Sequence, residues 1–501
     1  MIHRILVFIL ALNTGFTIAS NKNGTPNISI TNRTVADIVV STPQELTNAL
    51  AAVTAGGNIL IREGNYVFTS RISISKSGTS VNLISILPHP DNTGRAKLDF
   101  SAMAENSTNR AISLSGSYWY IKGIDVFGAG DNGMFIGGSN NLIEFCTFSE
   151  CKDTGLQIGS GATNNTILNC DSYFNADSLV ENADGFACKL DAGTGNKFIG
   201  CRAWQNLDDG WDGYLRPADN ITTTYENCWA FRNGYLKNGT IGGGDGNGFK
   251  TGGSDDKLLK HNAIYKNCIA AGNVFDGFDH NSNRGNVQLY NCGAYSNGKN
   301  ISFSSTNIAN SLTIKNTISL LGNSNDSYSA TTINITNNSW QNGLIANAGD
   351  FISLDINLLS SPRKADGSLP DIDFMKLVSD SDLIDKGIDV GIAFSGPAPD
   401  LGAFESVTLG LENLIIEQGV FNYPNPFTTE THVVFHTKET SKIEISIYNL
   451  MGMNVFNITQ ETYPAGKNSI MLNRSQLASG NYLLVIKGSN NQKNSKLIII
   501  Q

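Results

Sequence analysis

The stretch Asp209-Gly210-Trp211-Asp212 belongs to a phrase that recurs along the chain: a polar residue, a glycine, a large apolar residue and a variable residue. The other copies are Asn132-Gly133-Met134-Phe135, Thr154-Gly155-Leu156-Gln157, Asp184-Gly185-Phe186-Ala187, Asn247-Gly248-Phe249-Lys250 and Asp276-Gly277-Phe278-Asp279. Successive glycines are 22, 30, 25, 38 and 29 residues apart. A minimum step of 22 residues with variable insertions is typical of short strands joined by turns, and the 3.6-residue periodicity of helical repeats is missing. The phrase therefore predicts a solenoid of β-strands.

A second phrase runs alongside the first and strengthens this interpretation. Its copies are Asn169-Cys170, Gly200-Cys201, Asn227-Cys228, Asn267-Cys268, Asn291-Cys292 and Asn316-Thr317. Cysteines that recur in one position of a repeat behave as small buried hydrophobic residues, so we expect free thiols stacked in the core instead of disulfides. Stacked asparagines predict hydrogen-bonded ladders inside the turns. The fold class that follows is all-β, with a right-handed parallel β-helix as its main unit.

The two ends of the chain predict smaller elements. Thr42-Pro43-Gln44-Glu45 reads as a capping box, and the helix that it starts would place Leu46, Leu50 and Val53 over the open end of the strand stack and end at Gly56-Gly57. From about Gly419 the pattern changes to longer strand-like runs separated by turn residues, which indicates a small Ig-like β-sandwich. We expect a signal peptide at 1–20, the β-helix at 38–405, a linker at 406–418 and the sandwich at 419–501.

Composition and charge exclude several classes of protein. The chain has 501 residues, 16% of them charged, and a net charge of -9. No basic run supports nucleic-acid binding. His3 and Arg4 precede the apolar run 5–12, which is typical of an export signal and too short for a membrane span. We expect an exported monomer without a membrane span.

The repeat also predicts where chemistry takes place. Equivalent positions of successive coils stack about 4.8 Å apart. Aligning the glycines places Asp209 next to Asp184, and Asp212 next to Lys250, while Asp208 adjoins the same columns. Four carboxylates and a lysine should therefore converge on one face of one sheet.

Carboxylates this close do not all remain ionised unless a cation joins them. Oxygen ligands favour a hard metal, and a flexible carboxylate-rich site favours Ca²⁺ over Mg²⁺. Taken singly, an aspartate before a glycine is more often a turn residue. Taken together, the convergence of Asp184, Asp208, Asp209 and Asp212 predicts a calcium site.

Lys250 has two interpretations. It is either a surface lysine paired with Asp212, or a base that loses its proton near the working pH. A cation about 5 Å away disfavours an ammonium group by about 3 kcal/mol per unit charge at an effective dielectric constant of about 20. A base at this position therefore predicts an alkaline pH optimum.

The motifs around these residues resemble polysaccharide lyase family 9, which contains pectate lyases and rhamnogalacturonan lyases on a right-handed β-helix. The resemblance covers roughly residues 38–405 and rests on four stretches: 182–187, 200–204, 208–212 and 246–250. It implies that the four aspartates bind calcium and that Lys250 is the catalytic lysine. It further implies β-elimination on an acidic plant cell-wall polysaccharide, with Lys250 abstracting the C5 proton of a uronate.

Several alternatives remain open from the sequence. The polymer is either pectate, our first expectation, or rhamnogalacturonan or another uronate polymer, and side chains of the insertion 235–245 would decide between them. An alternative of another class is a non-catalytic β-helix, either an adhesin or a carbohydrate-binding module. The stretch Phe278-Asp279-His280-Asn281 is similar to the family, but His280 is open to two roles, sugar ligand or structural histidine.

The tail resembles a type IX secretion sorting domain. The resemblance rests on the motifs Tyr423-Pro424-Asn425-Pro426-Phe427, Ile445 to Gly452, Ser479-Gly480-Asn481-Tyr482 and Lys496 to Gln501. It implies the type IX secretion machinery as a partner, and export across an outer membrane followed by release or surface attachment.

Overall fold

The structure is a computed structural model in which residues 37–406 are described without a break. The other described residues are 14–20, 26–32, 421–423, 425–437, 440–449, 454–474, 477–488 and 493–500. The apolar run 5–12 of the expected signal peptide, and the expected linker apart from Ser406, lie outside them. The chain divides after Ser406 into two compact units. The strands β1 (Thr14–Ser20) and β2 (Pro26–Asn32) form an antiparallel hairpin.

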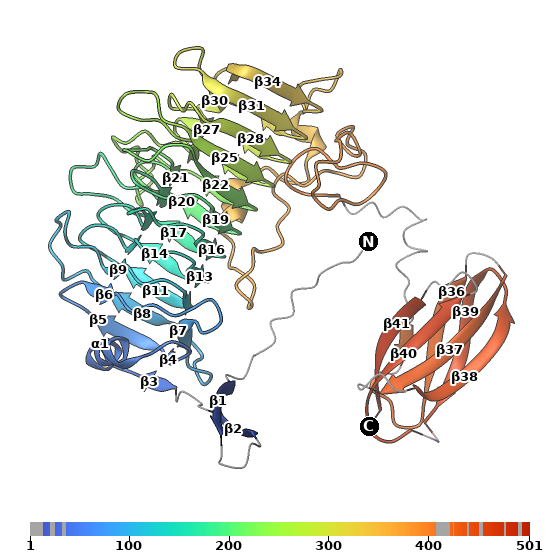
Figure 1. Ribbon diagram of the computed structural model, residues 1–501. Coiled ribbons are helices and arrows are strands. Elements are labelled where there is room, and N and C mark those ends of the chain that lie inside the picture. Colours follow the sequence, from blue (N-terminus) through green and yellow to red (C-terminus); the bar gives the residue numbers. More distant parts are fainter. Residues whose placement is uncertain are drawn as a thin grey trace. The chain divides into compact units, whose positions relative to one another are not determined.

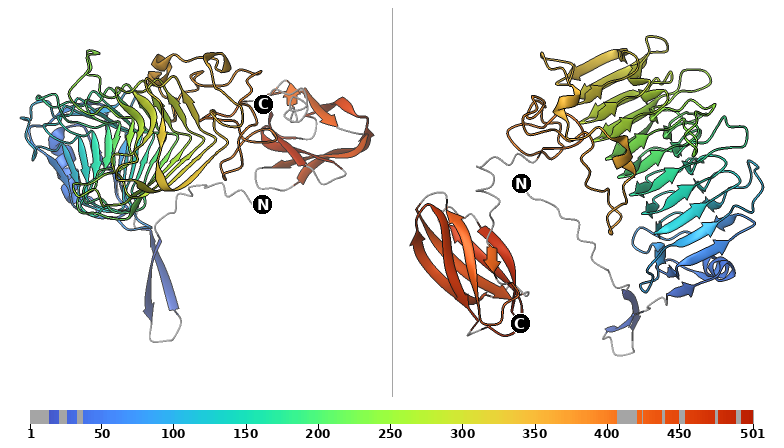
Figure 2. Two further views of the ribbon diagram at one scale, coloured as in Figure 1. Left: turned by 90° about the horizontal axis from the view of Figure 1, so that it is seen from above. Right: turned by 180° about the vertical axis from the view of Figure 1, so that it is seen from behind.

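The first unit is a parallel β-helix, as predicted, in which three sheets run the length of the stack (Figures 1 and 2). The first sheet contains β3 (Ile38–Val40), β4 (Asn58–Ile61), β7 (Ile84–Pro88), β10 (Trp119–Lys122), β13 (Leu142–Glu144), β16 (Thr166–Leu168), β19 (Asn196–Ile199), β22 (Ile221–Glu226), β25 (His261–Lys266), β28 (Asn286–Tyr290), β31 (Ala309–Lys315) and β34 (Ala330–Thr336). The second contains β5 (Gly64–Val67), β8 (Ala96–Asp99), β11 (Ile124–Phe127), β14 (Thr147–Ser149), β17 (Asp171–Tyr173), β20 (Arg202–Trp204), β23 (Trp229–Phe231), β26 (Ile269–Ala271), β29 (Gly293–Tyr295) and β32 (Ile318–Leu320). The third contains β6 (Ile72–Ile74), β9 (Ile112–Leu114), β12 (Met134–Ile136), β15 (Leu156–Ile158), β18 (Phe186–Cys188), β21 (Trp211–Asp212), β24 (Phe249–Lys250), β27 (Asp276–Asp279), β30 (Lys299–Phe303) and β33 (Ser327–Tyr328).

The large apolar residue of the recurring phrase fills the core of the third sheet. The rings of Phe186, Trp211, Phe249 and Phe278 stack from coil to coil, with centroids 5.1, 4.8 and 5.1 Å apart. All four are buried. Because side chains alternate between the two faces of a strand, the residue after each ring points to the outer face. The aromatic stack therefore fixes which residues the third sheet presents outward.

The predicted asparagine ladder exists, but its most buried part lies at a position that the sequence phrase did not mark. It runs through the turns between the second and third sheets and consists of Asn175, Asn206, Asn233, Asn273 and Asn297. Each side-chain amide donates to the next side-chain oxygen at 2.8–3.0 Å. Asparagines of the sequence phrase also bond from coil to coil, Asn267 to Asn227 at 3.2 Å and Asn316 to Asn291 at 2.9 Å, and they adopt left-handed backbone conformations, such as φ 53° at Asn227.

Replacing Asn206 by Ala should destabilise the β-helix. Asn206 is fully buried, and its Oδ1 accepts hydrogen bonds from both the backbone and the side chain of Asn175. The variant leaves these donors without an acceptor, which costs about 1–3 kcal/mol for each buried group. Calorimetry should show a lower midpoint for Asn206→Ala and an unchanged midpoint for Asn48→Ala, at an exposed helix position. Equal midpoints for the two variants would contradict a stabilising role of the ladder.

The cysteine prediction is confirmed. All eight cysteines are free and buried. The thiols of Cys170 and Cys201 lie 3.6 and 3.3 Å from carbonyl oxygens of the preceding coils. They act as small core residues with weak hydrogen bonds to the backbone.

The predicted helix forms at the N-terminal end of the stack as α1 (Pro43–Ala52) and covers that end with Leu46, Ala49 and Leu50 (Figure 1). Thr42 caps it by accepting a hydrogen bond from the Glu45 backbone N–H. The reciprocal half of the capping box is wrong in detail, because Glu45 accepts from the Ser41 N–H at 2.7 Å. The helix also ends at Ala52, before the Gly56-Gly57 pair.

Residues 337–406 follow the last strand of the coils and include the short helices η1 (Ala348–Asp350) and η2 (Ile356–Ser360). They pack Leu359, Phe374 and Leu383 against the second sheet. Arg363 extends the attachment, because its guanidinium lies 2.7 Å from the carboxylate of Asp171 on β17.

The second unit consists of two antiparallel sheets around its own core, as predicted for a β-sandwich. One sheet contains β35 (Phe421–Tyr423), β36 (Glu430–Thr437) and β39 (Gly466–Asn473). The other contains β37 (Ser441–Asn449), β38 (Asn454–Tyr463), β40 (Gly480–Gly488) and β41 (Lys493–Ile500).

Candidate active site

The register inferred from the glycines is the register of the third sheet. Ala187 pairs with Asp212, Asp212 with Lys250, and Lys250 with Asp279 on successive strands. Each of these residues comes immediately after a buried aromatic residue, so their side chains share the outer face of the sheet. The residues before the glycines form a second column, in which Asp184, Asp209 and Asn247 lie side by side.

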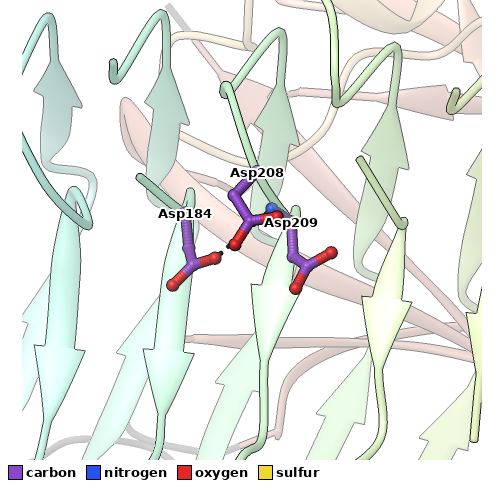
Figure 3. A group of neighbouring side chains, drawn as sticks. All are labelled: Asp184, Asp208 and Asp209. Atoms are coloured by element: carbon purple, nitrogen blue, oxygen red, sulfur yellow. Dashed lines mark hydrogen bonds between the residues drawn. The ribbon is translucent and has the colours of Figure 1, made fainter. Parts of the chain in front are cut away.

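Three carboxylates converge where the turns enter the third sheet (Figure 3). Oxygen atoms of Asp184, Asp208 and Asp209 all lie within 4.8 Å of one another. Asp184 and Asp209 are fully buried, and Asp208 is half-buried. Asp212, the fourth carboxylate predicted for the site, lies on the neighbouring column and is not part of this closest group.

Hydrogen bonds from the backbone orient these carboxylates. Oδ1 of Asp184 accepts from the N–H of Asp209 at 3.3 Å. Oδ1 of Asp209 accepts from both the backbone and the side-chain nitrogen of Asn247, at 3.0 and 2.8 Å. Oδ1 of Asp208 accepts from the N–H of Asp245 at 2.6 Å. Each of the three therefore uses one oxygen to bind its own fold. The second oxygen of Asp184 accepts a hydrogen bond from the Thr154 hydroxyl at 3.0 Å and pairs with Lys189, and the second oxygen of Asp209 pairs with Lys250.

Lys250 lies next to this group, as predicted. Its ammonium nitrogen is 3.1 Å from Oδ2 of Asp209 and 3.3 Å from Oδ2 of Asp245. The side chain is only 11% exposed. Asp212, the partner expected if Lys250 were only a paired surface lysine, is its register neighbour on the adjacent strand, but Lys250 forms its ion pairs with Asp209 and Asp245.

The carboxylates of the site outnumber its positively charged groups, and the pKa values of the site residues are shifted accordingly. Burial and the neighbouring Asp209 raise the pKa of Asp208 to about 9. Burial raises the pKa of Asp209 to about 7, although Lys250 opposes this. Burial lowers the pKa of Lys250, but Asp209, Asp212 and Asp208 outweigh it and hold that pKa well above its usual range. Without a further cation the cluster binds protons, which is the expected behaviour of crowded carboxylates.

The donor set fits a hard divalent cation. All donors are carboxylate oxygens, and three of them already converge. Oδ2 of Asp209 is buried and has no hydrogen bond, only the ion pair to Lys250. Buried carboxylate oxygens of this kind are suitable ligands for Ca²⁺, which takes several oxygen ligands in flexible geometry.

Two charged residues next to the site, Lys189 and Asp245, were not predicted from the sequence. Lys189 forms ion pairs with Asp184 and Asp212, and Asp245 with Lys250. Lys189 lies two residues beyond Ala187, so strand alternation places it on the same outer face. The signal for Lys189 was present in the repeat alignment. Asp245 lies in an insertion that the repeat does not align.

The structure favours the structural interpretation of His280. The imidazole is buried, its Nε2 lies 2.9 Å from the carbonyl oxygen of Asn283, and its ring is 5.6 Å from that of Phe303. Burial lowers the pKa of His280. Asp279 lies one coil beyond Lys250, and burial and Asp276 raise its pKa to about 7.

Comparisons with known proteins agree with this fold and site. Residues 27–325 match the model of the Pel9A-like, right handed beta helix region. Pectate lyase L of Dickeya chrysanthemi is 38% identical over 379 residues, which cover 73% of this chain and 86% of that protein. Pectate lyase L of Paenibacillus polymyxa is 40% identical over 366 residues, covering 68% of this chain and 79% of that protein.

Two solved structures are similar over most of the β-helix. The crystal structure of pectate lyase Pel9A has a TM-score of 0.66 at 36% identity and covers 74% of this chain and 96% of its own. A rhamnogalacturonan lyase has a TM-score of 0.59 at 29% identity and covers 67% and 92%.

The second unit is matched separately. Residues 422–501 match the model of the secretion system C-terminal sorting domain, which confirms the resemblance of the tail. Among the described helices, none has the length and apolar character needed to cross a membrane.

These relatives are enzymes, which argues against the reading as a non-catalytic adhesin. The family match spans more than half of the chain and coincides with the coils that carry the carboxylates and Lys250. The chain belongs to the Pel9A-like right-handed β-helix family and is a polysaccharide lyase.

Proposed function

We propose that this lyase cleaves pectate by calcium-dependent β-elimination. The observation that carries the proposal is the convergence of three carboxylates within 4.8 Å, with the nitrogen of Lys250 3.1 Å from one of them. A cation site beside a base suits the removal of a proton from the carbon next to a carboxylate. The cation stabilises the negative charge that develops, and the base takes the proton.

The calcium ligands in this proposal are Asp184, Asp208, Asp209 and Asp212. The first three present converging oxygens, and Asp212 lies beside them on the outer face of the third sheet. When bound, calcium supplies positive charge that holds the uronate carboxylate and acidifies the proton on C5. This also explains how a chain of net charge -9 attracts a polyanion.

Lys250 is the base in this mechanism. The free amine takes the proton from C5, the electrons of that bond form the C4–C5 double bond, and the bond between C4 and the glycosidic oxygen breaks. The carboxylates hold the pKa of Lys250 above its usual range. Their charge has to be neutralised before the ammonium loses its proton at moderate pH, so we expect an alkaline optimum.

Rhamnogalacturonan is the second candidate substrate. The similar structure of a rhamnogalacturonan lyase supports it, because the same uronate clamp and base would serve both polymers. The insertion 235–245, whose Asp245 contacts both Asp208 and Lys250, is the segment we expect to separate them.

A polymer panel tests the substrate. Purified protein with calcium should raise the ultraviolet absorbance of polygalacturonate solutions as unsaturated ends form, and do so faster than with rhamnogalacturonan or alginate. A faster rise on rhamnogalacturonan would select the second candidate. No rise on any uronate polymer would contradict both.

The C-terminal sorting domain implies type IX secretion to the cell surface or the medium. In this context the acidic plant cell-wall polysaccharide would be met outside the cell. The signal peptide at 1–20, the domain limits at 38–405, 406–418 and 419–501, and the monomeric state remain predictions.

A further inference from the structure

Lys189 is a second lysine at the candidate metal site, and the proposed reaction gives it no role. It directly follows β18, and its ammonium nitrogen lies 2.6 Å from Oδ2 of Asp184 and 3.2 Å from Oδ2 of Asp212. The two aspartates belong to successive coils. Lys189 therefore joins one residue of each of the two columns that form the site.

The surroundings of Lys189 explain why it is held there. The side chain is 12% exposed, and those of Asp184 and Asp212 are 0% and 9% exposed. Asp153, on the preceding coil, is a further negative charge that acts on Lys189. Buried carboxylates without a counterion are costly, and removing one partner of a buried ion pair strongly destabilises a fold. Lys189 supplies this counterion to two of the four carboxylates.

Lys189 and Lys250 divide the site between them. Lys250 contacts Asp209 and Asp245, whereas Lys189 contacts Asp184 and Asp212. One partner of Lys250, Asp245, has a side chain that is 65% exposed. Lys189 and Lys250 are about equally exposed, at 12% and 11%, but both partners of Lys189 are buried carboxylates, which is the arrangement of a structural counterion.

We propose that Lys189 is a built-in counterion that holds Asp184 and Asp212 together when calcium is absent and thereby weakens calcium binding. This rests on the proposed calcium site. A divalent cation bound by the same carboxylates competes with the ammonium, because two positive charges that share ligands repel each other. The lysine is thus a positioning residue that stabilises the calcium-free enzyme.

The test compares Lys189→Met with the wild type by isothermal titration calorimetry and thermal unfolding, each on chelator-treated and calcium-loaded full-length protein. The variant should bind calcium at least about tenfold more tightly, because a nearby positive charge is removed. Its unfolding midpoint should fall in the calcium-free state and fall much less in the loaded state. Lys189→Arg, which keeps the charge, should restore the wild-type values.

Lys197→Met is the matched control, because Lys197 lies on β19 of the first sheet and is exposed. It should leave both measurements unchanged. Calcium binding that is unchanged or weaker in Lys189→Met, or equal losses of midpoint in both states, would overturn the proposal. Absence of calcium binding in the wild type would instead refute the calcium site itself.

A double variant covers the case in which Lys189→Met does not fold without calcium. Lys189→Met with Asp212→Asn removes one carboxylate together with the lysine, and should regain most of the calcium-free midpoint. A double variant as unstable as Lys189→Met would contradict the counterion role.

Discussion

Replacing Lys250 by Ala should lower kcat on polygalacturonate by at least about a thousandfold, while calcium binding persists. General bases contribute about 10²–10⁴ to rate, and no other amine lies beside Asp209 among the described residues. The variant leaves Asp184, Asp208 and Asp209 in place, so calorimetry should still detect the calcium site. Initial rates of unsaturated-product formation, with calcium at saturation, check the expectation.

Lys250→Arg is the sharper control. Arginine retains a positive charge next to Asp209 and Asp245, but its pKa is too high for it to act as a base. It should therefore be as inactive as Lys250→Ala while being at least as stable. Activity within tenfold of the wild type in either variant would show that another group removes the proton.

Asp208→Asn should weaken calcium binding by at least about a hundredfold and abolish activity at ordinary calcium concentrations. Residues that only support metal ligands already contribute about 10–100-fold to affinity, so a direct ligand should contribute more. Asparagine keeps an oxygen that accepts from the Asp245 N–H. Titration calorimetry of chelator-treated protein measures the loss.

In the calcium-free protein we do not expect Asp208→Asn to lower the unfolding midpoint. The pKa of Asp208 is raised to about 9, first by burial and then by Asp209. An acid whose folded pKa lies above its unfolded value destabilises the fold as pH rises above that unfolded value. Removing its charge should therefore leave the calcium-free midpoint at pH 8 unchanged or higher. A lower midpoint, or the same effects in Asp91→Asn at an exposed carboxylate, would indicate general damage.

The repeat determines most of what could be predicted. A glycine and a large apolar residue at each coil define which side chains face inward, and the pairing of Asp212 with Lys250 follows from counting along aligned strands. Register is strongly specified in such a stack, because a slip of one residue would expose the aromatic column. This is why the columns of the site could be predicted without homologues.

The contacts that could not be predicted depend on how far, and in which direction, individual side chains extend. Asp212 belongs to the predicted column, but its Oδ2 is bound by Lys189, and the spacing does not show that Asp212 pairs with Lys189 and not with its register neighbour Lys250. Asp245 reaches Lys250 from an insertion of unaligned length. The ladder at Asn206 and its equivalents was not predicted, because the residues directly before these asparagines vary, from Phe174 and Gln205 to Gly272, and form no fixed phrase.

In the proposed mechanism the carboxylate cluster binds the calcium that β-elimination requires. The most direct measurement is product absorbance from polygalacturonate with chelator-treated wild-type enzyme, followed by calcium addition in steps. We expect no detectable product before addition and a rate that rises with the same calcium dependence as binding by calorimetry. A rate that is unaffected by the chelator would contradict it.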